Sequence, residues 1–590
     1  MLNKNINIAI LLLLPLVATN PLYAQSESSS DSTIDRSVTV EREFQPIIQD
    51  AGKLSVAPQR LEMDMESAEV RYSTFANPLQ TDFNFNTLGC SPSSFKNKAI
   101  ASPNYLEGAI GHPQTRFNFF YRLTPQKKIT LDFFAHHQAI WGRRIWENTQ
   151  IGMAYNMRLN AMDMYFSVDG NNRFYTRYGR YFDGDKGLTI KKYAELADND
   201  KQNIWTIHTR IGVRTRPGDN LQYRVETGYN AYIVPNVAAE HCIRTYGDVS
   251  YTEEKNTGGI HFFMQNALYS VDPMQHLADT LYNARHGLRI EPYYEFNSEA
   301  FRIHAGVNFD LNIGKGQMMS ASENVSFAPS PNVDFEYRIL PEWLALYGSA
   351  KGQFNFGLLE GYLGMNPYLE IIPGITSHHV SGYVPVDAAL GFRIHPVSTF
   401  LIDIYAHYCM SKNMSTFLSP DMSTLQAKQA AGDPSYLDYF YSDWQEWRVG
   451  AEFTYHYQDI VHILLGFNYH KWIQDSVEVF SDKYPGLTTT EGRAYDRPSW
   501  DLHLRVDARI DSKWSLYSDN RFAGARWALT TGEDVKLKPY INLSLGAQYE
   551  INTWLSCYLE LNNLMHRHND IFYGYQTIGI NGMAGVKWRF

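Results

Sequence analysis

The sequence lacks the features that mark several common classes of protein. No stretch approaches 18 consecutive apolar residues, so no transmembrane helix is predicted. The four cysteines, Cys90, Cys242, Cys409 and Cys557, are widely spread, and we expect isolated thiols rather than a disulfide framework. Acidic residues outnumber basic ones and the formal net charge is −10, which argues against a nucleic-acid partner.

Motifs for catalysis and for cofactor binding are also missing. We find no Gly-x-Ser-x-Gly elbow, no His-Glu-x-x-His and no phosphate-binding loop. His566, His568 and Asp570 could share one face and bind a metal, but a solvated loop is the simpler interpretation. We therefore expect no catalytic residues, no cofactor and no metal site, and an enzyme is the third of three functions considered.

The sequence does contain strict alternation of apolar and polar residues. Side chains alternate across a β-strand, so residues 500–510 predict a strand with one apolar and one charged face. The apolar face carries Trp500, Leu502, Leu504, Val506, Ala508 and Ile510, and the charged face carries Asp501, His503, Arg505, Asp507 and Arg509. At ~3.3 Å per residue and a tilt of about 45°, such a strand spans about 25 Å, the height of the apolar band on an outer-membrane barrel.

Similar segments fill the chain from residue 104 onward. We predict strands at 104–111, 115–123, 129–141, 148–158, 162–176, 203–215, 220–233, 238–252, 258–271, 285–297, 301–313, 324–339, 344–357, 382–395, 398–411, 444–457, 460–473, 497–511, 514–527, 537–551, 554–565 and 572–590. That gives 22 strands, with 20 as the lower alternative because the first two segments are the weakest.

The connections between these segments alternate in length. Tight turns such as 125–127 and 511–513 are rich in turn-forming residues, whereas the longest loops are predicted near 177–202, 358–381, 412–443 and 474–496. Short periplasmic turns and long extracellular loops are typical of outer-membrane barrels, and a soluble sandwich has no reason to segregate its loops. The fold class predicted is therefore all-β: a transmembrane antiparallel β-barrel of about 22 strands over residues 104–590.

The two ends of the chain indicate export. Lys4, the apolar residues 8–17 and a cleavage site after Ala24 predict a cleaved signal peptide over residues 1–24. The last strand ends with Trp588 and Phe590 on its apolar face, which resembles the C-terminal signal read by the outer-membrane assembly machinery; an ordinary edge strand is the alternative. We expect the protein in the outer membrane of a Gram-negative cell, in contact with its lipid and lipopolysaccharide.

The charged faces of the strands are candidates for the wall of the lumen. The candidate residues are Asp501, His503, Arg505, Asp507, Arg509, Asp387, Arg393, Asp403 and His407. They could form a selectivity surface for a polar solute, or salt bridges that fill space. The aromatic, acidic loop 434–447 could capture a sugar or a peptide, or belong to an interfacial aromatic girdle. Arg143-Arg144 could meet lipopolysaccharide phosphates or remain a solvated pair.

Several motifs resemble a known family. Leu545-Gly546-Ala547-Gln548-Tyr549-Glu550, Trp554-Leu555, Leu559-Glu560-Leu561-Asn562-Asn563-Leu564, Tyr573-Gly574-Tyr575 and the terminal Val586-Lys587-Trp588-Arg589-Phe590 resemble the end of TonB-dependent receptor barrels. Residues 38–46 and 50–53 resemble the mature start of a Bacteroidetes group of plugless or short-plug relatives. The resemblance implies a 22-stranded barrel and a TonB partner, for which Val38, Thr39 and Val40 are the candidate box that adds a strand to TonB.

The sequence departs from that family before the barrel. Only residues 25–103 lie between the predicted signal and the barrel, too few for a typical plug domain, and we predict a periplasmic arm that could reach into the lumen. The lumen must then be filled by this arm, by inward loops, by bulky side chains or by a partner. The best function is a TonB-dependent-receptor-like transporter or channel for an unidentified solute. The alternative is a non-transporting barrel that scaffolds a surface or secretion complex, with a periplasmic or surface partner.

Overall fold

A computed structural model describes most of the region predicted to form the barrel. It covers residues 104–590 with gaps at 180, 184–186, 191–199, 217, 272–283, 315–324, 342, 357, 370–381, 398, 422, 425, 427–436, 459, 475–488 and 491–492. All the described residues belong to one compact unit, Tyr72–Phe590. The predicted signal peptide, the arm 25–103 and the candidate TonB box lie outside the described residues.

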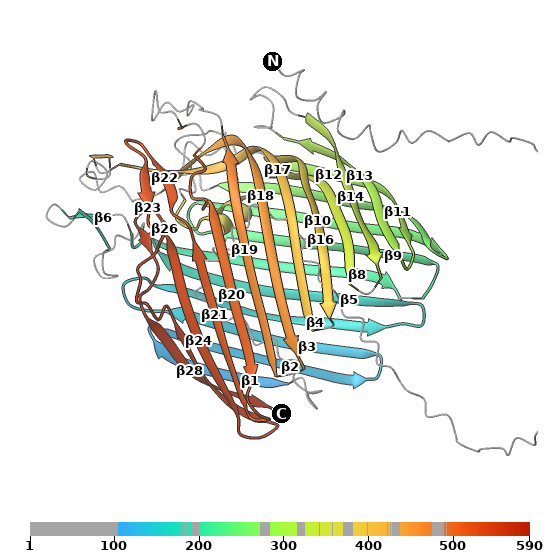
Figure 1. The fold of residues 1–590 in the computed structure, drawn as a ribbon, viewed down its shortest axis with the longest axis horizontal. Helices are drawn as coiled ribbons and strands as arrows, with labels where there is room; N and C mark the ends of the chain where they lie inside the picture. Colours follow the sequence, from blue (N-terminus) through green and yellow to red (C-terminus); the bar gives the residue numbers. More distant parts are fainter. Residues whose placement is uncertain are drawn as a thin grey trace, which may run out of the picture. The chain divides into compact units, whose positions relative to one another are not determined.

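Antiparallel strands form the wall (Figure 1). In order around the ring they are β1 (Tyr105–His112), β2 (Gln114–Gln126), β3 (Ile129–Ile140), β4 (Trp146–Arg158), β5 (Met162–Thr176), β8 (Lys201–Thr215), β9 (Leu221–Val234), β10 (Ala238–Glu253), β11 (Asn256–Val271), β12 (Arg285–Asn297), β13 (Phe301–Ile313), β14 (Val325–Leu340), β15 (Leu344–Asn355), β16 (Gly382–Val397), β17 (Phe400–Ser419), β18 (Asp438–Tyr457), β19 (Val461–Ile473), β20 (Trp500–Arg509), β21 (Trp514–Ala523), β24 (Tyr540–Glu550), β25 (Leu555–Asn562) and β28 (Asn581–Arg589). The prediction of a 22-stranded antiparallel barrel is confirmed.

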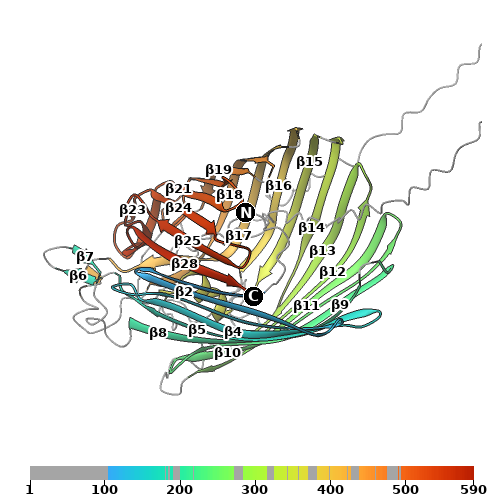
Figure 2. The ribbon, with the colours of Figure 1, turned by 90° about the horizontal axis from the view of Figure 1, so that it is seen from below.

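The ring closes between its first and last strands. β28 pairs antiparallel with β1 from Tyr105↔Arg589 to His112↔Gly582, and Figures 1 and 2 show β28 beside the blue strands. The Phe590 N–H donates to the carbonyl oxygen of Asn104 at 3.1 Å, so both described chain ends lie at one end of the barrel. The connections between strands at this end are all short, so we call it the short-turn end; the other, which carries the long connections, is the long-loop end. Closure leaves no strand edge unpaired in the ring.

The remaining elements are short and lie in long connections. They are the strands β6 (Tyr181–Asp183), β7 (Gly187–Thr189), β22 (Arg526–Thr530), β23 (Val535–Leu537), β26 (Asp570–Phe572) and β27 (Tyr575–Gln576), and the helix α2 (Leu359–Met365). In the part of the chain that the structure describes, no helix is long and apolar enough to cross a membrane.

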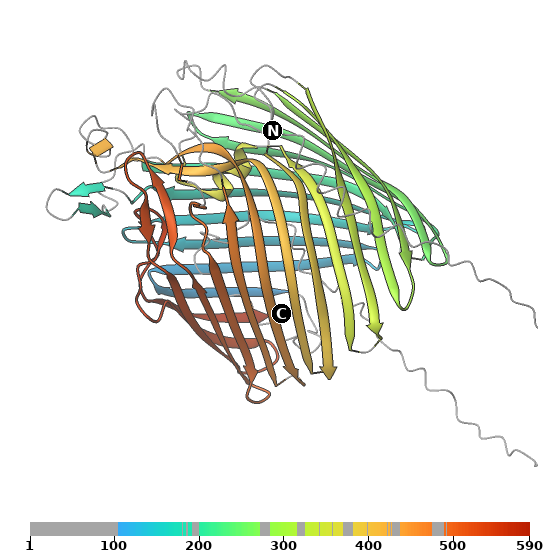
Figure 3. The ribbon, with the colours of Figure 1, turned by 45° about the horizontal axis from the view of Figure 1, so that its top comes forward.

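One predicted loop is strand at both of its ends. Residues 412–443 were expected to form a loop, but β17 runs to Ser419 and β18 starts at Asp438, so most of the aromatic loop 434–447 is part of β18. The Ser and Thr residues that suggest a loop bond across the hairpin instead: the Thr416 and Ser442 hydroxyls are 2.7 Å apart. A register shift after Ser411 bends the hairpin, and the end of β17 pairs parallel with β22 (Figure 3).

Two strand predictions near the C-terminus overrun in the opposite sense. The predicted strand 514–527 ends at Ala523, and β22 is a separate strand that leaves the wall to pair with β23. The predicted strand 572–590 begins only at Asn581, because β26 and β27 form a separate small hairpin before it. Alternation alone does not show where a chain leaves the wall for the loops.

Large apolar side chains are exposed on the outer face of the wall. Ile110 is 67% exposed, Ile151 63% and Phe327 61%, whereas on the inner face Arg505 is 7% and Asp507 0% exposed. A soluble monomer rarely exposes a continuous apolar surface of this kind, which water would penalise. The outer face therefore suits lipid, and the polar residues are directed inward.

Tyrosines on the inner face lie flat on glycines of the next strand. In the described strands this occurs in the pairs Tyr165–Gly212, Tyr293–Gly259, Tyr347–Gly391, Tyr405–Gly450, Tyr517–Gly546 and Tyr558–Gly585. The hydroxyl often reaches one strand further: Tyr347 donates to Asp403 and Tyr558 donates to Glu107, both at 2.5 Å. Each glycine supplies the space that the ring occupies, so these pairs tie three strands together.

We predict that filling one of these spaces destabilises the barrel. A Cβ at Gly546 would lie 2.0 Å from Cε1 of Tyr517, whereas a Cβ at Gly466 meets nothing within 4 Å. Gly546→Ala should lower the free energy of unfolding by about 1–3 kcal/mol, as overpacking does, and Gly466→Ala should leave it nearly unchanged. Urea unfolding of the barrel in lipid vesicles measures both. The cost should shrink in a Tyr517→Ala background; an equal cost in both backgrounds would contradict the pairing.

Candidate functional site

Four of the predicted lumen residues of β20 form ion pairs with one another or with neighbouring strands. Arg505 contacts Asp507 at 2.7 Å and Asp519 of β21 at 3.4 Å, and His503 approaches the same Asp519 at 3.3 Å. Asp501 lies on the other side, 2.6 Å from Nε2 of His470 on β19. Arg509 follows at the end of β20 nearest the short turns.

The predicted residues of β16 and β17 form two further pairs. Nε2 of His407 lies 2.5 Å from Asp387, and Arg393 lies 3.8 Å from Asp403. Arg393 also contacts Glu336 of β14 at 3.2 Å. The structure thus brings the predicted residues together in pairs along the inner wall rather than at one binding centre.

A histidine–carboxylate network lies further around the ring and was not singled out from the sequence. Each imidazole bridges two carboxylates: His261 lies 2.5 Å from Asp248 and 3.1 Å from Glu291, and His304 lies 3.1 Å from Glu291 and 2.9 Å from Glu295. An imidazole that donates from both nitrogens is a cation. These residues come from β10 to β13, so only the register between strands, which the sequence does not give, could have revealed them.

Buried apolar side chains cross the barrel interior at the long-loop end. We call them the spanning cluster: Tyr175, Tyr178, Ile204, Tyr232, Val234, Ala238, Leu359, Tyr362, Leu363, Tyr368, Leu369, Leu437, Phe572 and Tyr575. They come from β5 and β8–β10 in the wall and from the connections before β8, β16, β18 and β28. Tyr368 stacks on Tyr575 with ring centroids 3.8 Å apart and meets the ring of Tyr175 in β5 edge-on at 6.4 Å, so the connections pack on each other and on the wall. Inward loops, one of the predicted ways to fill the lumen, are therefore present.

The helix α2 holds the centre of this cluster. Leu359, Tyr362 and Leu363 are buried, at the i, i+3, i+4 spacing of one helical face. Seven residues with two glycines make a marginal helix in isolation, so packing must stabilise it. Leu437, which lies just before β18, is bonded to the connection that contains α2: its N–H donates to the carbonyl oxygen of Tyr368 at 3.0 Å.

Charged groups of the wall anchor the start of α2. Glu240 of β10 accepts the Leu359 N–H at 2.7 Å, a favourable place for a carboxylate beside a helix N-terminus. Glu360 lies 3.3 Å from His208 of β8 and 3.4 Å from Arg244 of β10. The hydrogen bond from His208 lowers the pKa of Glu360 against the effect of burial, with Arg244 adding to the lowering. Glu360 is therefore held ionised at neutral pH.

Arginines at the long-loop end are also engaged with loops. The guanidinium of Arg144 lies 5.4 Å from the ring centroid of Tyr178, and burial lowers its pKa. Arg144 is thus packed against the spanning cluster. Arg143 is exposed, so both predictions for it stand: contact with lipopolysaccharide phosphates, or contact with solvent alone. Arg526 of β22 donates to the carbonyl oxygens of Asp570 and Ile571, which fixes β26.

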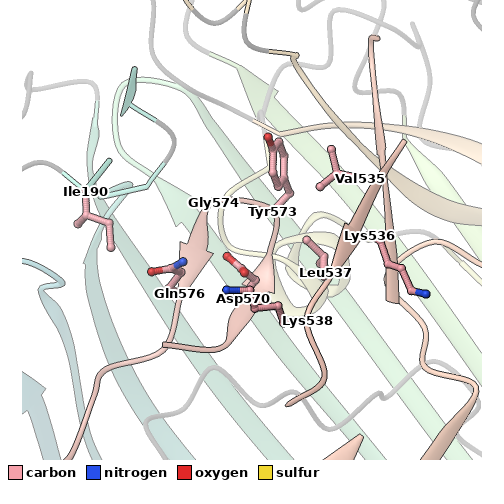
Figure 4. Close-up of a pocket in the computed structure, with 9 residues that line it drawn as sticks. All are labelled: Ile190, Val535, Lys536, Leu537, Lys538, Asp570, Tyr573, Gly574 and Gln576. Carbon is pink, nitrogen blue, oxygen red and sulfur yellow. The ribbon is translucent and has the colours of Figure 1, made fainter. Parts of the chain in front are cut away.

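A small pocket with both charged and apolar side chains lies at the long-loop end. Its volume is about 220 Å³, and it is lined by Ile190, Val535, Lys536, Leu537, Lys538, Asp570, Tyr573, Gly574 and Gln576 (Figure 4). Asp570 and Gln576 face each other across the β26–β27 hairpin. No motif in the sequence marks this pocket, because its walls come from three separate connections.

The possible metal ligands do not converge. The rings of His566 and His568 lie 5.3 Å apart, but Nδ1 of His566 accepts the Ile580 N–H at 3.0 Å. A neutral His566 then carries its proton on Nε2 and cannot bind a metal there. Asp570 points into the pocket instead, and the described residues contain no cluster of three metal-binding side chains.

The search for known relatives of this chain gave different results at the levels of sequence and structure. No protein-family model matches the chain, and no curated protein matches it. Solved structures do match. The FrpB iron transporter from Neisseria meningitidis has a TM-score of 0.62 at 8% identity, covering 82% of this chain and 81% of that one. The ferric-catecholate import receptor Fiu from E. coli K12 has a TM-score of 0.57 at 10% identity, covering 84% and 82%.

A third match is the copper transporter OprC, with a TM-score of 0.57 at 11% identity, covering 82% of this chain and 80% of that one. These neighbours are TonB-dependent receptors with 22-stranded barrels. The identities are low, so the likeness concerns the fold. The chain has the barrel fold of the TonB-dependent outer-membrane receptors.

Proposed function

We propose that this chain is an outer-membrane receptor or transporter of the TonB-dependent type whose extracellular mouth is closed by its own loops. The observation that carries the proposal is the combination of a closed ring with an exposed apolar outer face and an ion-paired interior. A soluble protein gains nothing from that arrangement, whereas a barrel in lipid requires it. The long-loop end is then extracellular and the short-turn end periplasmic.

The same proposal includes the export and energy-coupling segments. Residues 1–24 serve as the cleaved signal, and Trp588 and Phe590 serve the assembly machinery. Val38, Thr39 and Val40 add a strand to TonB. The chain resembles a Bacteroidetes group of plugless or short-plug relatives, so in this proposal the spanning cluster closes part of the lumen that a plug domain would close.

The second candidate is the non-transporting scaffold with a blocked lumen. The spanning cluster favours it, because an interior crossed by packed side chains is also what a scaffold would have. The two candidates differ in what the periplasmic side binds: an energy-coupling partner in the first, a constant structural partner in the second.

Binding of the purified TonB C-terminal domain to the full chain in detergent should separate them. We expect measurable binding by calorimetry that Thr39→Pro abolishes, because proline removes the N–H that an added strand needs. Thr33→Pro, in the serine-rich stretch before the box, is the control and should bind normally. Absence of binding together with a stoichiometric partner in the purified wild-type complex would favour the scaffold.

A further inference from the structure

The β26–β27 hairpin has two differently used faces. Phe572 and Tyr575 are buried in the spanning cluster, and Phe572 also packs on Phe417 of β17 at 5.3 Å between ring centroids. Asp570, Tyr573 and Gln576 line the pocket on the other side. The pocket therefore lies on one face of the β26–β27 hairpin, and the other face of the hairpin packs into the spanning cluster.

The hairpin is fixed where these two faces meet. The Tyr178 hydroxyl donates to the carbonyl oxygen of Gln576 at 2.9 Å, and Arg526 holds the carbonyls of Asp570 and Ile571. A Cβ at Gly179 would lie 2.4 Å from the carbonyl oxygen of Gly574, so the backbones meet closely there. These contacts give the pocket a preformed shape, which lowers the cost of ordering a ligand.

The polar groups of the pocket carry both signs of charge. Figure 4 shows the Asp570 carboxylate, the Gln576 amide and the Lys538 ammonium gathered at the centre, while Lys536 points away from them. Burial raises the pKa of Asp570, against the hydrogen bond from Gln576 and the positive charges of Arg526 and Lys538. A cationic group bound beside Asp570 would compensate the burial of its carboxylate.

The rest of the wall is apolar. Ile190, Val535 and Leu537 lie around the charged centre, in a pocket of about 220 Å³. A ligand with one charge would pair with only one of Asp570 and Lys538, whereas a ligand with both charges would pair with each of them. A zwitterion with an apolar side chain matches both charges and the wall.

We propose that this pocket binds an α-amino acid with an apolar side chain. The ligand ammonium lies against Asp570 and Gln576, its carboxylate lies against Lys538, and its side chain packs on Leu537 and Ile190. This proposal rests on the receptor function proposed above and names the class of solute that the extracellular mouth recognises.

Calorimetry with L-leucine and the full chain in detergent micelles tests the site. Two analogues of leucine each lack one of its charged groups: leucinamide lacks the carboxylate, and 4-methylpentanoate lacks the ammonium. Wild-type protein should bind leucine at least tenfold more tightly than either analogue. Lys538→Gln should remove the preference over leucinamide, and Asp570→Asn should remove the preference over 4-methylpentanoate. Lys513→Gln is the control and should behave as wild type, because Lys513 lies in the short turn before β21, at the opposite end of the barrel from the pocket.

The outcome is independent of TonB binding, so the two proposals can fail separately. Equal binding of leucine and both analogues, leucine binding that both variants leave unchanged, or binding of glucose in place of leucine would each overturn the assignment. The heat-modifiable migration of each variant on a gel shows that the barrel is folded before binding is measured.

Discussion

Arginine in place of Val506 should slow or block assembly of the barrel in the membrane. Val506 lies in the middle of β20 on its apolar outer face, where it is paired in register with Ile463 of β19. An arginine on the lipid face near the midplane costs about 2–4 kcal/mol, because the hydrocarbon cannot solvate its charge. Leu504→Arg should have a similar effect for the same reason.

The matched control lies on the same strand and faces the interior. His503 already contacts Asp519 at 3.3 Å, so His503→Arg places a positive charge beside that carboxylate. The measurement is the fraction of each variant that shows heat-modifiable migration after folding into lipid vesicles. Assembly of Val506→Arg at the rate of His503→Arg would contradict the assignment of the two faces.

The second large effect concerns the helix α2. Leu359 is 1% and Leu363 2% exposed within the spanning cluster. Truncating a buried leucine to alanine lowers the free energy of unfolding by about 2–5 kcal/mol. A helix of only seven residues cannot offset such a loss. We expect Leu359→Ala with Leu363→Ala to displace α2 and to turn a rarely conducting barrel into one that opens frequently in a planar bilayer.

Two glycines of the same helix give a control of opposite sign. Gly361 and Gly364 are exposed, and a Cβ at either position meets nothing within 4 Å. Alanine in an exposed helix interior is favoured over glycine by about 1 kcal/mol, so Gly361→Ala with Gly364→Ala should make openings rarer than in the wild type. If both double variants conduct as the wild type does, α2 does not control the pore.

The sequence predicts the wall much better than the interior, for a physical reason. Alternation such as Leu502, Leu504 and Val506 records which face meets lipid, and it repeats along every strand. The face of α2 that carries Leu359, Tyr362 and Leu363 is a single turn long. A signal of that length does not distinguish an inward helix from an ordinary loop.

The interior networks depend on register, which a single sequence does not contain. Tyr517 and Gly546 are far apart along the chain and meet because β21 pairs with β24 at that position. His261 and Glu291 meet in the same way across β11 and β12. The predicted residues on β16, β17 and β20 were found because each strand carries several charges itself, and their partners on β14, β19 and β21 were not.

The ion-paired interior also bears on permeation. Positive and negative groups alternate along the inner wall, as in Arg505 between Asp507 and Asp519, and the histidines are held between carboxylates. Channels that select ions by charge expose a ring of one sign. A pore opened through this wall would present neither sign in excess at these networks, so it would discriminate weakly between cations and anions. Selectivity would then depend on recognition at the mouth and not on the electric field of the passage.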